Sequence, residues 1–260
     1  VRGVSAAMGR CELTHRAREP IDIERARAQH RAYVAALAEL GCRVHELPED
    51  PALPDSVFVE DTAVIVEPAA VITRPGAPSR RGETDSIRDA LRVHLDLRSM
   101  APPATLDGGD VLRVGRTLYV GISGRSNAEG IDQLRRLVAP QGYGVVAVSV
   151  RGCLHLKSAV TEVAPGLLLA NRERMDAETF EGYRWIDVDP AEPEAANGLR
   201  VADVVLFPAA FPRTASRLRR AGVAVRLLDL SELAKAEGAV TCCSLIWHET
   251  PGARSAACDP

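Results

Sequence analysis

The chain has 260 residues, 46% hydrophobic and 26% charged, which is the composition of a globular protein with a sizeable core and argues against disorder. A net charge of -3, without a basic stripe interleaved with aromatic residues, argues against nucleic acid as a partner. No apolar run reaches the roughly 18 residues that a membrane span needs, and the start VRGVSAAMGR lacks the apolar core of a secretion signal, so we expect no membrane association and a cytoplasmic location.

The predicted elements begin with a helix over residues 23–40, which ends at Gly41, and a strand over 42–47. Residues 57–74 contain two β-rich runs around a turn, which predicts a hairpin. A helix follows over residues 84–95, where Ile87, Leu91 and Leu95 have helical spacing. The order hairpin, helix, strand is the unit that the rest of the chain repeats.

The second unit has a hairpin over 107–123 and a strand over 144–150. Its helix is predicted to begin at the capping-box pattern from Ser126 to Glu129. The third has a hairpin over 156–173, a short helix over 176–183 and a strand over 185–189. The fourth runs from Leu199 through a helix around 216–219 to a strand over 223–230. A fifth unit is divided between the ends, with strand material at 239–247. This period of roughly 50 residues predicts a closed cyclic array, and we interpret residues 1–260 as a single domain.

Four segments place polar residues where a core strand would favour apolar ones. Glu60 and Asp61 interrupt the run LPDSVFVEDTAVI, and two adjacent acids in a strand point to opposite faces. At least one would then face the interior and require a cationic ligand or an arginine, although the end of a strand at the surface explains the pair equally well. The second segment is LDGGDVL, where two glycines permit a close approach of backbone or ligand, or form a plain turn.

The third segment, GCLHLKSA, carries His155 inside an apolar run, and the fourth, AEGAVTCCSL, carries Cys242, Cys243 and a serine. Each has an ordinary structural explanation, since lone buried histidines and cysteines usually serve packing. Together the four segments supply a thiol, an imidazole and carboxylates, which is the set that a cysteine hydrolase acting on a cation requires. No cysteine pair has the spacing of a structural zinc site, and we expect free thiols and no bound metal.

The segments FVED, RPGAPSRR, LDGGDVL, GRSN, LHLKS and TCCS, in this order, resemble the dimethylarginine dimethylaminohydrolase family over nearly the whole chain. The resemblance implies the pentein fold, an α/β propeller of five ββαβ units around a central active site. It also implies hydrolysis of Nω-methylated arginines to citrulline and a methylamine through a covalent cysteine intermediate, without a cofactor.

Residue roles follow from the same resemblance. Cys242 is the expected nucleophile, His155 the acid/base, and Asp107 the acid beside that histidine, where some relatives have Glu. The acids expected to bind the guanidinium are Glu60 and Asp61. Asp55 and the backbone carbonyls of Leu13 and Ala236 are expected near the α-amino end of the substrate. Arg80 and Arg125 are expected to hold the α-carboxylate, and Ser244 is a further expected substrate-binding residue.

Two alternative functions remain open on the sequence. An arginine deiminase or another amidine hydrolase of the same fold would use the same core residues, and a non-catalytic pentein protein would bind a partner instead. The expected partner is a small methylated arginine, and the sequence leaves a homodimer open.

Overall fold

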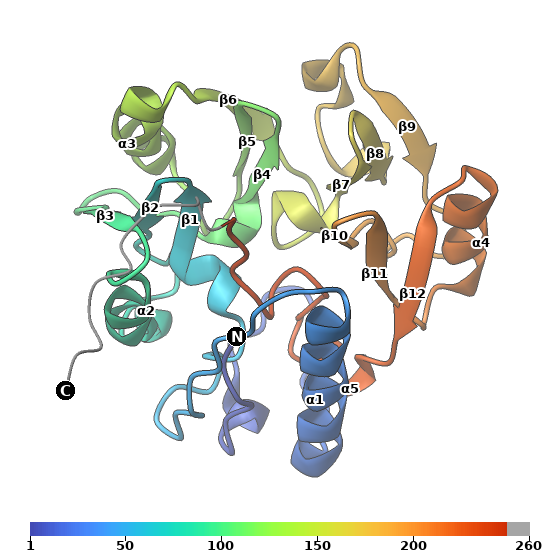
Figure 1. The fold of residues 1–260 in the computed structure, drawn as a ribbon, viewed down its shortest axis with the longest axis horizontal. Coiled ribbons are helices and arrows are strands. Elements are labelled where there is room, and N and C mark those ends of the chain that lie inside the picture. The colour runs from blue at the N-terminus through green and yellow to red at the C-terminus, as the bar shows by residue number, and fades with distance from the viewer. Residues whose placement is uncertain (249–260) are drawn as a thin grey trace.

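The computed structural model describes residues 1–248. Four three-stranded sheets surround a common centre (Figure 1), and each is built in the same way. The first two strands form an antiparallel hairpin, and the third lies parallel to the second. The strands are β1 Ala63–Val66, β2 Ala69–Ile72 and β3 Asp96–Ser99; β4 Val111–Val114, β5 Thr117–Ile122 and β6 Gly144–Ser149; β7 Val160–Ala164, β8 Leu167–Ala170 and β9 Arg184–Asp187; β10 Leu199–Val201, β11 Val204–Pro208 and β12 Ala224–Leu228.

A parallel third strand requires a crossover connection, and helices provide it in three of the sheets. The helices α2 Glu83–Leu91, α3 Ala128–Val138 and α4 Pro212–Arg220 bury one apolar side each. The β7–β9 sheet has the 3-10 helix Ala177–Phe180 in the position where a short helix was predicted. The repeated order of hairpin, helix and strand is therefore confirmed for four units, and none of the helices described could cross a membrane.

The predicted start of the second unit's helix was wrong by one residue. Asn127, rather than Ser126, is the N-cap of α3, because its side-chain oxygen accepts the N–H of Gly130 at 2.8 Å. The Ser126 hydroxyl instead donates to Asp110 Oδ2 at 2.6 Å. An internal carboxylate competes for this serine, and the sequence pattern does not reveal that competition.

The strands predicted for the fifth unit were also wrong within the described residues. Of residues 42–47, Leu47 alone forms a bridge, which is parallel to Arg2. Residues 240–243 form a turn, where the N–H of Cys242 bonds to Ala239 O at 3.2 Å and that of Ser244 to Thr241 O at 3.5 Å, and residues 244–247 have no regular secondary structure. The Cys242 carbonyl accepts the N–H of Glu60, so the polar backbone groups here pair with a turn rather than with a neighbouring strand.

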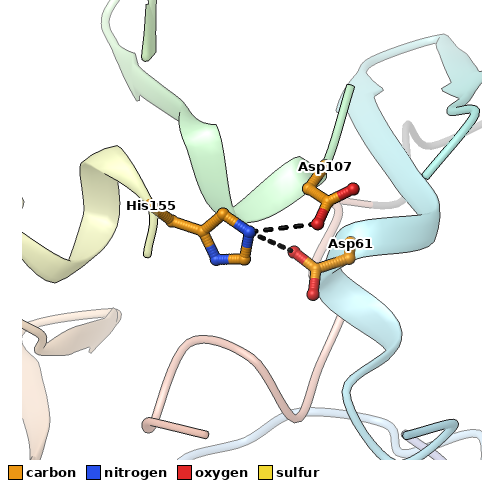
Figure 2. A group of neighbouring side chains, drawn as sticks. All are labelled: Asp61, Asp107 and His155. Atoms are coloured by element: carbon orange, nitrogen blue, oxygen red, sulfur yellow. Dashed lines mark hydrogen bonds and ion pairs between the residues drawn. The ribbon is translucent and has the colours of Figure 1, made fainter. Parts of the chain in front are cut away.

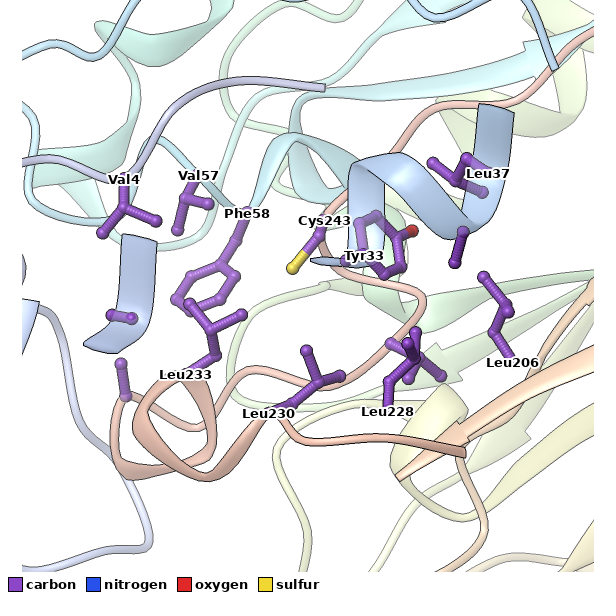
Figure 3. Close-up of a cluster of buried hydrophobic side chains, with 14 of the residues drawn as sticks. Val4, Tyr33, Leu37, Val57, Phe58, Leu206, Leu228, Leu230, Leu233 and Cys243 are labelled. Carbon is purple, nitrogen blue, oxygen red and sulfur yellow. The ribbon is translucent and has the colours of Figure 1, made fainter. Parts of the chain in front are cut away.

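Helix α1 Ile23–Glu39 and the short α5 Ser231–Lys235 close this part of the ring. Tyr33 of α1 and Leu233 of α5 are fully buried in one apolar cluster with Phe58 and Cys243 (Figure 3). The Tyr33 hydroxyl, which needs a partner when buried, bonds to Ser244 Oγ at 2.7 Å. This cluster anchors the chain immediately beside Cys242.

Candidate active site

Residues from most of the units meet in a narrow pocket near the centre of the ring. It is lined mainly by charged and polar side chains together with the segment from Ala236 to Gly238: Glu12, Asp55, Phe58, Asp61, Arg80, Arg125, Leu154, His155, Ala236, Glu237, Gly238 and Cys242. Seven of the residues predicted from the sequence are among them, namely Asp55, Asp61, Arg80, Arg125, His155, Ala236 and Cys242. These seven residues span nearly two hundred positions of the sequence, and the fold brings them together in one central site.

Glu60 and Asp61 lie in the 3-10 helix Val59–Thr62 and not in a strand, which corrects the prediction that they face opposite sides of a sheet. The Thr62 hydroxyl donates to Val59 O at 2.7 Å and so favours the turn over an extended backbone. Both carboxylates are buried, and each pairs with a cationic side chain, as a charged carboxylate in the interior requires. Asp61 pairs with Arg80 at 2.5 Å, and Glu60 pairs with Lys157 at 2.5 Å.

His155 is buried and forms its closest polar contact with Asp107. Its Nε2 lies 3.1 Å from Asp107 Oδ2 and 4.0 Å from Asp61 Oδ1 (Figure 2). Gly109 permits this arrangement, because a Cβ there would lie 2.5 Å from Nδ1 of the imidazole. Gly108 is equally constrained, since a Cβ would lie 1.9 Å from the Glu60 carbonyl oxygen. Both interpretations of LDGGDVL hold, because Gly108–Asp110 forms a 3-10 turn and the two glycines also permit a close approach.

The acidic surroundings of His155 favour its charged form. Burial, the largest influence, lowers its pKa, but Asp61, the hydrogen bond that the imidazole donates to Asp107 and the nearby Asp110 raise it more, to about 9. The same contacts act on Asp61, where burial is outweighed by His155 and Arg80 and the pKa falls to about 2. At neutral pH the pair is therefore an imidazolium beside a carboxylate.

The two cysteines of TCCS point in different directions. Cys242 lines the pocket, whereas Cys243 is 0% exposed and lies in the apolar cluster with Tyr33 and Phe58 (Figure 3). Burial, followed by the charges of Glu60 and Asp61, raises the pKa of the Cys242 thiol well above its usual value. At neutral pH the thiol of the empty pocket is therefore neutral.

The remaining predicted residues surround this centre. Arg80 also bonds to both oxygens of Glu83, at 3.0 and 2.8 Å, while Arg125 Nη1 lies 3.7 Å from Asp107 Oδ2. Asp55 accepts the N–H of Glu12 on both carboxylate oxygens, at 3.2 and 3.1 Å. The pocket has acidic and basic groups close together, which suits a zwitterionic ligand of the amino-acid type.

Some predicted residues do not line the pocket in the described structure. Leu13 packs at the edge of the apolar cluster, and Ser244 bonds to Tyr33. Glu60 bonds to Lys157 and Thr241. Asp107 is 0% exposed and contacts the pocket through His155 and Arg125.

Sequence reasoning missed Glu237, whose carboxylate accepts three consecutive backbone N–H groups. These belong to Thr14, His15 and Arg16, at 2.9, 2.6 and 2.7 Å. Glu237 has a positive φ of 60°, which is uncommon for a residue with a side chain and is a signal that a sequence does not carry. The contact fastens the segment 12–16, which we call the cover loop, to the rim of the pocket.

Among residues 1–248, one group of side chains has the spacing of a metal site, namely Asp61, Asp107 and His155, with candidate ligand atoms within 4.8 Å of one another. These donors already bond to protein groups, because Asp107 accepts the N–H of Gly76 and Asp61 that of Gly109. The chemistry expected for the pocket requires no metal, and its absence remains a prediction.

Comparisons with known proteins agree on one family. Residues 10–181 match the family model described as N,N dimethylarginine dimethylhydrolase, eukaryotic. The chain is 42% identical over 250 residues to the dimethylarginine dimethylaminohydrolase of Streptomyces coelicolor, a match that covers 96% of both chains.

Two solved structures are similar throughout. One is the Pseudomonas aeruginosa enzyme, as a cysteine-to-serine variant complexed with citrulline, with a TM-score of 0.86 and 34% identity over 93% of this chain and 95% of that one. The other is a dimethylarginine dimethylaminohydrolase with histidine replaced by glycine, as an adduct with S-methyl-L-thiocitrulline, with a TM-score of 0.89 and 34% identity over 93% and 96%. These matches confirm the predicted α/β propeller fold.

Proposed function

The chain belongs to the dimethylarginine dimethylaminohydrolase family, and on this premise we propose that it hydrolyses Nω-methylated arginines to citrulline and a methylamine, with Cys242 as nucleophile. The observation that carries the assignment of residues is that Cys242, His155 and Asp61 line one pocket, with Asp107 bonded to the histidine. Citrulline, the product of this reaction, is bound in the related solved structure.

The acids of the pocket are suited to a guanidinium. This group is planar and cationic, and carboxylates bind its N–H groups in a directional, charge-assisted way. Asp61 supplies such an oxygen to the pocket, and the neighbouring Glu60 adds negative charge from the same turn, while Asp55 and Arg125, which also line the pocket, suit the α-amino and α-carboxylate ends. Asp61 is held by Arg80 and by the N–H of Gly109, so its orientation is fixed before a substrate arrives.

The chemical step begins when the Cys242 thiolate attacks the guanidinium carbon and forms an S–C bond. The C–N bond to the methylated nitrogen breaks as His155 donates its proton to the departing amine. A water molecule then attacks the thiouronium carbon while the neutral His155 takes its proton. The C–S bond breaks, and citrulline and the cysteine are released.

The substrate itself assists the ionisation of the nucleophile. Burial and the charges of Glu60 and Asp61 keep the thiol neutral in the empty pocket, and a bound guanidinium compensates those two charges. The thiolate is therefore favoured when the substrate is present.

An arginine deiminase or another amidine hydrolase is not favoured, because relatives that match over nearly the whole chain are named dimethylarginine dimethylaminohydrolases. A binding protein without activity would not need an acid-paired histidine in the same pocket as a cysteine. The cytoplasmic location and a homodimer remain predictions.

The test is the release of citrulline from asymmetric dimethylarginine, monomethylarginine and arginine, measured side by side. We expect turnover of the methylated substrates, its loss in Cys242→Ser, and its retention in Cys42→Ser, which removes a thiol outside the pocket lining. Turnover of arginine alone would indicate a deiminase. Activity that survives in Cys242→Ser would refute the assignment of the nucleophile.

A further inference from the structure

Four side chains that are distant in sequence form a closed ring of hydrogen bonds next to the pocket: Glu60, Lys157, Asn197 and Thr241. Lys157 Nζ donates to Glu60 Oε1 at 2.5 Å, and the Thr241 hydroxyl donates to Glu60 Oε2 at 2.8 Å. The Asn197 amide nitrogen donates to Thr241 Oγ1 and to the Lys157 carbonyl oxygen, both at 3.0 Å. We call this set the polar ring.

The donors and acceptors of the polar ring are matched. Asn197 Oδ1 accepts the backbone N–H of Thr241 at 3.2 Å, so a reversed amide would set a donor against that N–H and an acceptor against the Lys157 carbonyl. The Thr241 hydroxyl accepts from Asn197 and donates to Glu60, which gives it one role in each direction. Each of the two carboxylate oxygens of Glu60 has its own donor.

Every member of the polar ring except Asn197 lies within two residues of a group assigned to the chemistry. Glu60 precedes Asp61, Lys157 is two residues after His155, and Thr241 precedes Cys242. The N–H of Glu60 also bonds directly to the Cys242 carbonyl at 3.1 Å. We propose that Lys157, Asn197 and Thr241 are positioning residues, which through Glu60 hold the Cys242 turn in register with the segments that carry His155 and Asp61.

Asn197 can serve as the fixed point because its own backbone is held. The Thr161 hydroxyl of β7 donates to the carbonyl of Ala196 at 2.8 Å and accepts the N–H of Gly198 at 3.0 Å. These bonds clamp the residues on both sides of Asn197 to a sheet. A side chain that is held in this way keeps its hydrogen-bond partners in place, which is the function of a supporting group for a reactive residue.

Burial makes the polar ring sensitive to the loss of any partner. Glu60, Asn197 and Thr241 are all buried, so a removed donor leaves an unsatisfied group away from water. Burial raises the pKa of the Glu60 carboxyl, and the Lys157 ammonium limits that rise and so favours the ionised form. The other titratable groups that act on Glu60 or sense its charge are Asp61, Cys242, Cys243 and Tyr33.

The first experiment compares Thr241→Val with Thr241→Ser, and Asn197→Ala with Asn171→Ala. The serine keeps the hydroxyl, and Asn171 carries an equivalent amide outside the pocket lining, bonded to Pro193 O. Hydrogen exchange of the peptide that covers residues 239–243 reports the support without any substrate. We expect exchange about tenfold faster in Thr241→Val and Asn197→Ala, and unchanged exchange in the two controls.

In the same variants kcat for a methylated arginine should fall by about tenfold to a hundredfold, because the nucleophile is no longer held in an attacking position. This arm rests on the proposed function. If the unaltered protein released no citrulline, the proposed function would fail, whereas the exchange result would still decide whether the polar ring holds the Cys242 turn. Unchanged exchange, or faster exchange with an unchanged kcat, would overturn the positioning role.

The second experiment is a pH profile of kcat/KM for Lys157→Met and Lys157→Arg. Without a cation beside it, Glu60 should take up a proton at higher pH, so we expect the acid limb of the methionine variant to move upward by about one unit or more. The arginine variant should keep the limb of the unaltered protein. A methionine variant whose activity falls equally at every pH would show that Lys157 serves packing alone, and would overturn its part of the inference.

Discussion

Replacement of Asp107 by asparagine tests the acid/base pair most directly. Asparagine has nearly the shape of aspartate and can still accept the N–H of Gly76, so the fold around it should persist. What it loses is the charge opposite His155 Nε2, at 3.1 Å. Hydrogen bonds that involve a charged group contribute about 2 kcal/mol, which corresponds to a fall of roughly 1.5 units in the pKa of the imidazole.

The sign of the effect follows from which form of His155 the first step requires. The pKa of His155 is about 9, so at pH 8 roughly nine-tenths of the imidazole is protonated and able to donate to the leaving amine. A pKa near 7.5 would leave roughly a quarter protonated at that pH. The variant should therefore lose about fourfold in kcat/KM at pH 8 from ionisation alone, and less at pH 6, with any loss of ring orientation added at both values.

The measurement is a titration of the His155 imidazole by NMR with labelled histidine, alongside the pH profile of citrulline release. Asp107→Glu, which keeps the charge, is the matched control and should retain a high pKa. A His155 pKa that stays near 9 in Asp107→Asn would refute the reasoning, because Asp61 alone would then account for the protonated imidazole.

Three further predictions concern other contacts, and a fourth concerns the effect of the Asp107–His155 pair on stability. Gly109→Ala should lower kcat by about a hundredfold, since its methyl group would displace the His155 ring, while Gly144→Ala, which meets open space, should leave steady-state kinetics unchanged. Glu237→Gln should raise KM by about tenfold with a smaller change in kcat, because the cover loop loses a charged acceptor for three N–H groups; equal KM values would contradict this role. Cys243→Ser should lower the free energy of unfolding by about 1 to 3 kcal/mol and preserve turnover, as urea denaturation and the citrulline assay can show. Asp107→Asn should be most destabilising below pH 6.5 and less so as the pH rises through 9, because a raised histidine pKa stabilises the folded state only while the imidazole is protonated; a pH-independent difference in urea denaturation would count against the ion pair.

The sequence predicts the repeated part of the fold because its signals are local. Spacing such as that of Ile87 and Leu91 identifies a helix, and the hairpins follow from apolar runs on both sides of a turn. The segment 239–247 is different, since it has the apolar pattern of a strand but contains a turn over 240–243 and no strand. Its backbone pairs with Glu60, a partner that is nearly two hundred positions away and that no local pattern reveals.

The candidate site was predicted in a similarly uneven way. The residues themselves indicated a thiol, an imidazole and carboxylates, and the family resemblance supplied their expected roles. The partners that support them were missed, because Lys157, Asn197 and Glu237 are ordinary polar residues in the sequence. Their significance arises from distances that the fold creates, such as the 2.5 Å between Lys157 and Glu60.

The way in which Glu237 holds the cover loop has a consequence for the timing of turnover. The groups that line the pocket belong to sheets and turns of one ring, so a substrate does not need two lobes to separate before it enters. Release of three N–H groups from one carboxylate frees the loop. Opening of a pocket-side loop that is held in this way occurs within microseconds to seconds, a range that includes the turnover times of most enzymes. Opening of the cover loop can therefore limit kcat, in which case a variant that weakens the Glu237 contact would release citrulline faster even though it binds substrate less tightly.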